Sequence, residues 1–364
     1  METSKPAWAK RLLIFCDGPW PKYDWYPSDV NEMFPKGWDD PPFLDDRPSN
    51  VLRLSRCIEP LSHDNIYQVV LHKHSDDSHR RLSADEVSVA FAWKIWEIYN
   101  FITKIYGAGD QIYIFGILEG AFMARKVASL LDALGILDDE QMRSFFRYWR
   151  DSNQPHTNRP GREVEIELLG IWDSAVSDLE NIVTVKLADL LGAKNNSLPA
   201  CVKRARYAMA YHEANAQYTA FEVSGGDRRA AQVWFPGTRP DVGGEYPYSQ
   251  ISDISLLWMA GEIQDMGIDL NITGLAHLLS SIEISLGLEV RDINPQECDS
   301  EETTQLWKIE GRGELFQASM SDPSAYCHRS MWAPLVRLSQ PHPTDPQDRY
   351  YPAYWTQPVL PAPL

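Results

Sequence analysis

The chain has 364 residues, of which 44% are hydrophobic, so it can bury the core of one large α/β domain. Its 51 acidic residues outnumber its 34 basic ones and give a formal charge of -17. That field repels polyanions, so we expect no nucleic acid partner. No stretch approaches the roughly 18 consecutive apolar residues of a membrane span, and the opening METSKPAWAKR lacks the apolar core of a signal peptide. We therefore expect a cytoplasmic protein without stable membrane insertion.

The cysteines and aromatic residues narrow the chemistry further. The five cysteines are scattered, with no Cys-x-x-Cys pair, and predict reduced thiols rather than disulfides or a zinc site. We expect neither a metal nor a cofactor. The chain also holds 13 Trp, 16 Tyr and 12 Phe, enough to line a large apolar pocket, although most core aromatics serve only packing.

The first predicted elements surround a long irregular segment. Arg11–Cys16 (RLLIFC) is an apolar run closed by Asp17 and a glycine, which predicts a strand and a turn. Residues 19–47, including Trp20, are rich in Pro, Trp and Asp without periodicity, and we interpret them as a flap or lid loop. Ser49–Ile58 predicts a short helix that begins at a Ser or Asn cap.

Strands and helices then alternate along the chain. A polar, His-rich stretch (HKHSDDSHRRLSADE) lies between the second predicted strand and the long helix that follows it. Apolar patterns predict strands at Ile66–Leu71, Gln111–Phe115, Val164–Trp172 and Ala231–Pro236, and helices at Ala84–Tyr106, Ala121–Leu134 and Ser252–Met266. Polar residues follow the strands' carboxyl ends. This order predicts an α/β fold with a doubly wound, mostly parallel sheet and a site at its carboxyl edge. We expect one domain over residues 1–340 and an extended, Pro-rich tail over residues 341–364.

One stretch, QIYIFGILEGAFMARKVASLL, has the shape of a nucleophile elbow without a nucleophile. A strand runs into Gly-Ile-Leu-Glu-Gly, and a helix follows. In the G-x-S-x-G elbow a Ser occupies the strained turn between strand and helix. Here that position is Leu118, whose side chain cannot attack a substrate.

Several ordered motifs resemble one family, the α/β-hydrolase domain of type VI secretion phospholipase effectors and their fungal relatives of unknown function. The resemblance covers roughly residues 11–269 and implies an α/β-hydrolase-like fold. The matching stretches are FCDGPW from Phe15, PSNVLRL from Pro48, GILEGA from Gly116, GIWDS from Gly170, WFPGTRPDVGGEY from Trp234 and ISDISLLWM from Ile251.

The departures from the family pattern concern the catalytic machinery. The resemblance puts Leu118 at the Ser position and Arg239 at the aligned His position. A guanidinium stays protonated and cannot act as a base. The family has a Gly-rich turn at the place that follows the predicted strand Ile66–Leu71. In this chain that place reads Leu71-His-Lys-His-Ser-Asp76. We therefore expect no Ser-His-Asp hydrolysis.

Five residues are candidates for acid/base chemistry, each with a simpler alternative. Asp17 either acts at the site or caps a turn, and Asp173, aligned with a triad acid, is either reassigned or a relic held by the backbone. Glu119 is a solvated first-turn residue or, if it enters an apolar pocket, a usable acid. His72 is a new base, part of a metal pair with its neighbour two residues on, or a surface histidine. His328 is a base from the last strand or a packing residue.

Further residues are expected to shape a pocket. Leu118 would form an apolar wall, with Trp20 and Trp172 beside it. Arg239 either forms a salt bridge or clamps an anionic group, and Asp241 lies in a tight strand-to-helix turn.

Three functions are compatible with these residues. The first is a non-hydrolytic enzyme, a lyase, isomerase, dehydratase or cyclase, that acts on an apolar small molecule. The second is a catalytically dead pseudo-hydrolase that binds a ligand or a partner protein. The third is residual hydrolysis by an unrecognised nucleophile such as Cys16 or Ser174. A homo-oligomer is compatible with all three.

Overall fold

The computed structural model describes the sheet and the helices that cover it. The described residues are 9–18, 48–74, 84–143, 161–173, 175–176, 198–211, 219–220, 227–235, 239–244, 250–278, 292–293 and 325–328. The proposed flap (19–47) and the Pro-rich tail (341–364) therefore lie outside the described residues.

The main sheet has eight strands in the order β2-β1-β3-β4-β6-β8-β10-β9 within the described part of the chain. Every neighbouring pair is parallel except β10 and β9. A two-stranded antiparallel sheet of β5 (Ala175–Val176) and β7 (Thr219–Ala220) lies apart from it. The main-sheet strands are β1 (Lys10–Asp17), β2 (Tyr67–His74), β3 (Gln111–Ile117), β4 (Ile166–Trp172), β6 (Ala205–Ala210), β8 (Ala230–Phe235), β9 (Asp292–Ile293) and β10 (Ala325–His328).

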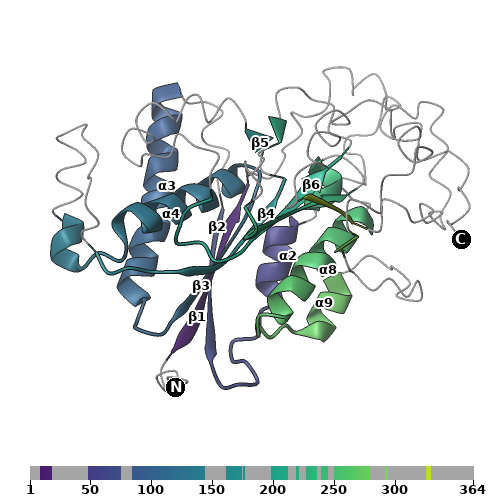
Figure 1. Cartoon of the computed structure of the whole chain (residues 1–364), viewed down its shortest axis with the longest axis horizontal. Helices are drawn as coiled ribbons and strands as arrows, with labels where there is room; N and C mark the ends of the chain where they lie inside the picture. The colour runs from purple at the N-terminus through teal and green to yellow at the C-terminus, as the bar shows by residue number, and fades with distance from the viewer. Residues whose placement is uncertain are drawn as a thin grey trace, which may run out of the picture.

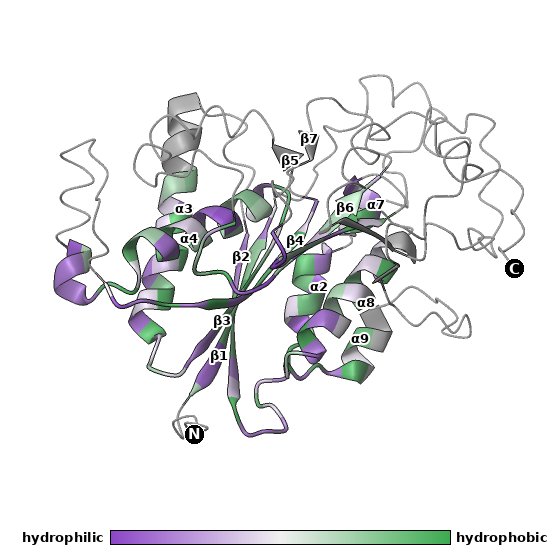
Figure 2. Ribbon diagram, in the orientation of Figure 1, coloured by the Kyte–Doolittle hydropathy of each residue, from purple (hydrophilic) through white to green (hydrophobic). Residues whose placement is uncertain are grey.

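Helices cover both faces of the sheet, as Figure 1 shows, with α3 and α4 on one side and α2, α8 and α9 on the other. This arrangement confirms the doubly wound, mostly parallel α/β fold. The helices are α2 (Asn50–Arg56), α3 (Ala84–Ile105), α4 (Glu119–Leu134), α7 (Arg239–Gly243), α8 (Gln250–Gln264) and α9 (Ile272–Leu278). Figure 2 shows both hydrophobic and hydrophilic residues on α2, α8 and α9, as helices with only one face on a sheet require.

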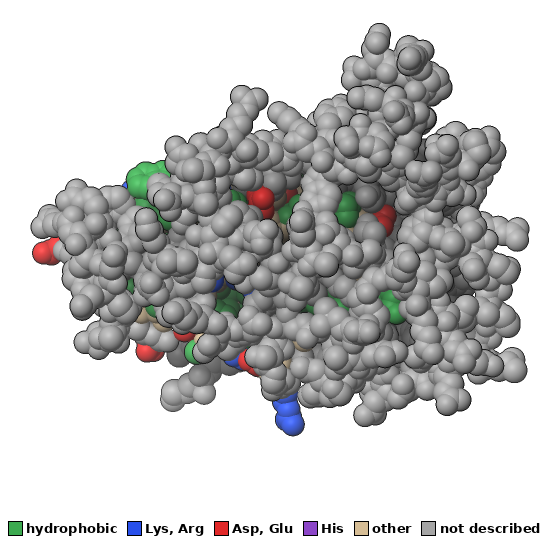
Figure 3. Space-filling model, turned by 90° about the horizontal axis from the view of Figure 1, so that it is seen from above, with side chains coloured by type: hydrophobic (Ala, Val, Ile, Leu, Met, Phe, Trp, Pro, Cys, Tyr) green, Lys and Arg blue, Asp and Glu red, His purple; other side chains and the backbone are tan. Residues whose placement is uncertain are grey.

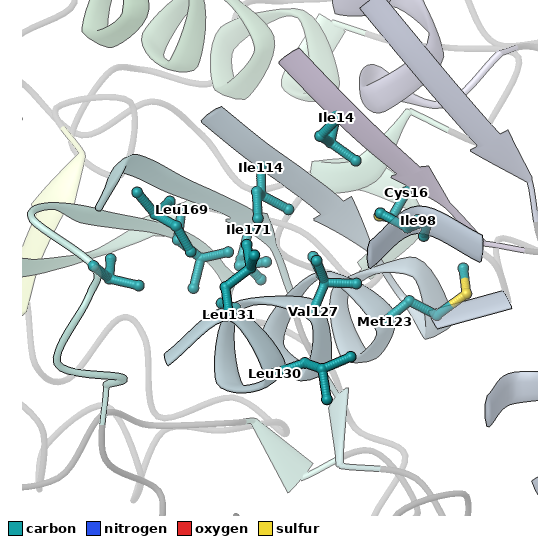
Figure 4. Close-up of a cluster of buried hydrophobic side chains, with 14 of the residues drawn as sticks. Ile14, Cys16, Ile98, Ile114, Met123, Val127, Leu130, Leu131, Leu169 and Ile171 are labelled. Atoms are coloured by element: carbon teal, nitrogen blue, oxygen red, sulfur yellow. The ribbon is translucent and has the colours of Figure 1, made fainter. Parts of the chain in front are cut away.

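Two hydrophobic cores fill the space between the sheet and its helices, because alternate strand residues point to opposite faces. Figure 4 shows the core on the α4 side, where Met123, Val127 and Leu131 lie over Ile114 and Ile171 of the sheet. The other core joins the opposite strand faces, including Phe15 and Phe115, to α2 and α8. The rings of Phe15 and Phe115 are stacked with centroids 4.8 Å apart.

Most predicted elements are confirmed with bounds that differ by a few residues, but the structure differs from the prediction in three respects. The polar stretch after the second predicted strand is partly strand, because β2 continues to His74. The central strand β6 and the helix α9 were not predicted. The Asp241 turn is part of the short helix α7.

Candidate functional site

The strand order locates the site at the carboxyl ends of β1 and β3. From β1 the chain passes through α2 to β2 on one side, and from β2 through α3 to β3 on the other side of β1. Because α2 and α3 cover opposite faces, the direction of winding reverses between β1 and β3 (Figure 1). Ligands of open α/β sheets bind outside the carboxyl ends of the strands at this reversal. Asp17 ends β1 there, and Leu118 directly follows β3.

Leu118 has the backbone conformation of a strained strand-to-helix turn. Its φ of 53° and ψ of -122° lie in the region that favours glycine, which costs a branched residue about 1–3 kcal/mol. Its carbonyl accepts the N–H groups of Ala121 (3.1 Å) and Phe122 (3.3 Å) and so starts α4. The side chain is half-buried and packs against the core on the α2 side. The predicted elbow is therefore present, with a leucine at its apex.

The two glycines of the elbow are required by packing. A Cβ at Gly120 would lie 2.0 Å from the carbonyl oxygen of Cys16, inside the backbone of β1. A Cβ at Gly116 would lie 2.6 Å from the carbonyl oxygen of Gly120. Both contacts are made by main-chain atoms, so they do not depend on the side chain at the apex. The close approach of α4 to β1 thus explains why both glycines remain although the apex holds no nucleophile.

The residue after Asp17 lies directly against the apex. A Cβ at Gly18 would be 3.0 Å from the Cβ of Leu118 and 3.2 Å from its Cδ1. Any residue with a Cβ at this point would require the leucine to shift by a few tenths of an ångström. Leu118 therefore lies over the end of β1.

Asp17 is the centre of a buried polar cluster at this edge. Its side chain faces the α2 side of the sheet, as Phe15 does two residues earlier, and the residue is only 2% exposed. Its Oδ1 accepts a hydrogen bond from the Ser49 hydroxyl (2.8 Å). Its Oδ2 lies 3.2 Å from Nε2 of His72. The cluster joins β1, β2 and the start of α2.

His72 lies in a strand, which corrects the expectation of a polar turn. It pairs with Phe15 across the parallel β1–β2 ladder, so its side chain shares the face of Asp17. Its side chain is 26% exposed, whereas that of Asp17 is 3% exposed, so the ring connects the buried carboxylate to solvent. Lys73, the next residue of β2, points to the opposite face, and its Nζ lies 2.5 Å from Oε2 of Glu97 in α3.

Asp173 lies two strands away and holds the backbone together. Its φ is 33°, and its N–H donates to the carbonyl of Ala208 (2.8 Å). Its Oδ1 accepts the N–H of Ala210 (3.0 Å), and the residue is 2% exposed. These bonds tie the end of β4 to β6 and favour the structural alternative for Asp173. Trp172 beside it is fully buried in the core on the α2 side.

The other predicted residues occupy separate places. Glu119 is the first residue of α4 and is half-buried. Arg239 begins α7 and is buried, and Asp241 lies half-buried in the same short helix. His328 ends β10, as expected of a residue in a late strand, but its side chain, like Trp20, lies outside the described part of the structure. Among the candidates in the described residues, the structure therefore places His72 against Asp17 and Leu118 against the residue that follows Asp17.

A buried polar network behind the site was missed by the sequence reasoning. The amide of Asn50 donates to the carbonyls of Val242 (2.9 Å) and Ser252 (2.8 Å), and its oxygen accepts a hydrogen bond from Arg53 (2.8 Å). Arg53 also forms a buried ion pair with Asp253. The network fixes α7 and α8 against α2. Its signal was available, since these residues belong to the PSNVLRL and ISDISLLWM motifs.

The thiol of Cys16, which precedes Asp17 in the chain, is buried in the core on the α4 side of the sheet. Burial raises the pKa of the Cys16 thiol well above its ordinary value, and the neighbouring Asp17 carboxylate raises it further. Among the described residues, no group of three or more His, Cys, Asp or Glu side chains is placed to hold a metal ion. No helix in the described ranges has the length and apolarity to cross a membrane. Seen from above, hydrophobic and acidic side chains appear between residues that are not described (Figure 3).

Comparison with known proteins gives distant relatives. An uncharacterized protein of Saccharomyces cerevisiae, YEL023C, is 29% identical over 103 residues, which cover 23% of this chain and 15% of that protein. Two solved structures also match. One is an uncharacterized protein from Pseudomonas aeruginosa (15% identity, TM-score 0.42, 76% of this chain and 48% of that one). The other is the Tle1 effector bound to the VgrG spike of the type 6 secretion system (17% identity, TM-score 0.39, 66% and 52%).

The chain thus spans about half the length of these solved structures and a smaller part of the yeast protein. A family model, described as the catalytic domain of Tle1-like phospholipase effectors of type VI secretion, matches residues 10–262. The match includes the elbow, the Asp17–His72 contact and the network between α2 and α8. The chain belongs to the family of Tle1-like phospholipase effector catalytic domains.

Proposed function

We propose that this chain is a non-hydrolytic enzyme that uses His72 as an acid/base on an apolar small molecule. The contact between His72 and Asp17 at the carboxyl ends of β2 and β1, next to the reversal of the sheet, carries the proposal. A histidine oriented by a buried carboxylate, with one ring nitrogen left over, is a common general base. In this proposal Leu118, which lies against the residue after Asp17, supplies an apolar wall at the same edge of the sheet.

The chemistry follows from these three side chains. A proton passes from a carbon or hydroxyl of the substrate to the ring nitrogen of His72 that faces away from Asp17. The carboxylate stabilises the imidazolium that results, because an opposite charge nearby favours the charged ring. The same nitrogen returns the proton to another atom of the substrate. The cycle consumes no water. Isomerases, lyases and cyclases likewise do not use water as a reactant to split a bond.

Hydrolysis by the family's mechanism is disfavoured at two positions. We propose that Leu118 replaces the nucleophile and Arg239 replaces the base. Acyl transfer to an enzyme needs both a nucleophile and a group to accept its proton. Cys16 is no substitute, because its thiol is buried and its pKa is raised. Ser174 lies outside the described residues.

A second candidate is a pseudo-hydrolase that binds a ligand or a partner protein. The observation that favours it is the role of Asp173, whose carboxylate accepts the backbone N–H of Ala210. A triad acid that holds two strands together has a structural reason to persist without catalysis.

The test compares wild type with His72→Gln and Asp17→Asn variants. Each protein is incubated with an organic extract of the cells that express it, in heavy-oxygen water, and consumed and formed compounds are followed by mass spectrometry. We expect a conversion that needs both residues and incorporates no heavy oxygen. Incorporation of heavy oxygen, or labelling of one Ser by a fluorophosphonate, would instead establish a hydrolase. A compound retained by the protein without conversion would establish the binding role.

A further inference from the structure

Ser49 has a role that goes beyond starting a helix. It is the N-cap of α2, and its Oγ accepts the N–H of Leu52 at 3.1 Å. The same Oγ lies 2.8 Å from Oδ1 of Asp17, and the residue is buried. A hydroxyl has one hydrogen to donate. Because the Leu52 N–H already supplies a hydrogen to Oγ, the hydroxyl hydrogen is directed at Asp17.

This hydrogen bond determines what Asp17 offers to His72. A donated hydrogen bond favours the ionised form of a carboxylate, and an ionised carboxylate can only accept. Oδ1 receives the Ser49 hydroxyl, which leaves Oδ2 facing Nε2 of His72 at 3.2 Å. Nε2 must therefore carry a hydrogen. In the neutral ring the lone pair is then on Nδ1.

We propose that Ser49 is a positioning residue that holds Asp17 as an acceptor and so fixes neutral His72 with its hydrogen on Nε2 and its proton-accepting lone pair on Nδ1. The helix cap and the site thus share one hydroxyl group, since the Ser49 hydroxyl that caps α2 also orients the carboxylate at the end of β1. That Nδ1 acts on a substrate rests on the proposed function. The position of the ring hydrogen does not, because it exists without a substrate.

The experiment reads the tautomer of His72 directly. Protein with nitrogen-15-labelled histidine is studied by NMR over a pH series, and the tautomer is read on the alkaline plateau, where the ring signals no longer change with pH. The His72→Gln variant identifies the signals of this ring by their loss. In wild type we expect the Nε2–H tautomer. Ser49→Gly removes the hydroxyl while glycine remains a fair N-cap, and we expect a mixture of both tautomers. Ser49→Thr keeps a hydroxyl and should restore the wild-type signals.

A cap elsewhere supplies the control. Asn271 precedes α9 and accepts the N–H of Gly274 at 2.7 Å, and α9 packs on α2. Asn271→Gly should leave the His72 signals unchanged. If wild type shows the Nδ1–H tautomer or a mixture, or if Ser49→Gly keeps the wild-type tautomer, the inference is wrong. If His72→Gln leaves a conversion intact while the tautomer behaves as expected, the proposed function fails and the inference stands.

Discussion

Gly120→Ala should destabilise the fold although it improves the local helix propensity. The added Cβ would lie 2.0 Å from the Cys16 carbonyl oxygen, 2.5 Å from its carbonyl carbon and 2.7 Å from the carbonyl carbon of Asp17. All three are backbone atoms of β1, which is flanked by two strands and cannot rotate away as a side chain can. Forcing atoms into a packed interior costs about 1–3 kcal/mol, and the rigid contact favours the upper end. The gain from replacing a helical glycine is at most about 1 kcal/mol.

The net expectation is a loss of about 2 kcal/mol in the free energy of unfolding, measured as a lower urea midpoint by circular dichroism. Gly261→Ala is the matched control, because Gly261 is exposed within α8 and a Cβ there meets nothing within 4 Å. That variant should gain about 0.5–1 kcal/mol from helix propensity alone. If both variants shift the midpoint upward, the elbow glycine is not required by the contact of α4 with β1, and our explanation for its retention fails.

Three further predictions concern groups outside the elbow. Asp253→Asn removes the charge of the carboxylate that pairs with the buried guanidinium of Arg53 and should cost about 3–5 kcal/mol in urea unfolding, with a smaller effect counting against the ion pair. Cys16 should resist a thiol reagent in the native protein and react only after denaturation, so fast labelling of the native thiol would contradict its burial. Burial opposes the ionisation of Asp64, yet the hydrogen bonds from Arg11 and Ser62 and the nearby positive charge together outweigh it, and the pKa is lowered to about 2 from 3.8. The resulting stabilisation is complete above pH 3.8 and is lost as the pH falls toward 2, so Asp64→Asn should flatten that part of the acid unfolding curve.

The sequence was sufficient for elements whose pattern is strong. The elbow was predicted because a buried strand, two glycines and an amphipathic helix follow one another. The strand β6 (ARYAMA) was missed, since its alanines and methionine are typical of helices and it has no β-branched residue. Burial on both faces of the sheet overrides that preference, because the strand lies between β4 and β8.

The candidate site was only partly predictable for a related reason. His72 looked like a loop residue because β2 is the edge strand, where polar side chains reach solvent and the apolar pattern stops before the strand does. Its contact with Asp17 depends on the strand order and on the pairing of His72 with Phe15. Neither is encoded in local periodicity. Ser49 was expected as a helix cap, but its second partner lies 32 positions earlier in the chain.

The network between α2 and α8 has a consequence for the order of folding during synthesis. Arg53 and its partner Asp253 are separated by 200 positions, and Asn50 reaches Ser252 across a similar span. When α2 leaves the ribosome, the residues of α8 that will bind its polar side chains have not yet been translated. The contacts between α2 and α8 can form only after a long segment of chain has closed into a loop, which costs conformational entropy. Domains that depend on such distant contacts fold slowly. The polar groups of α2 in the nascent chain therefore lack these partners until α8 has emerged.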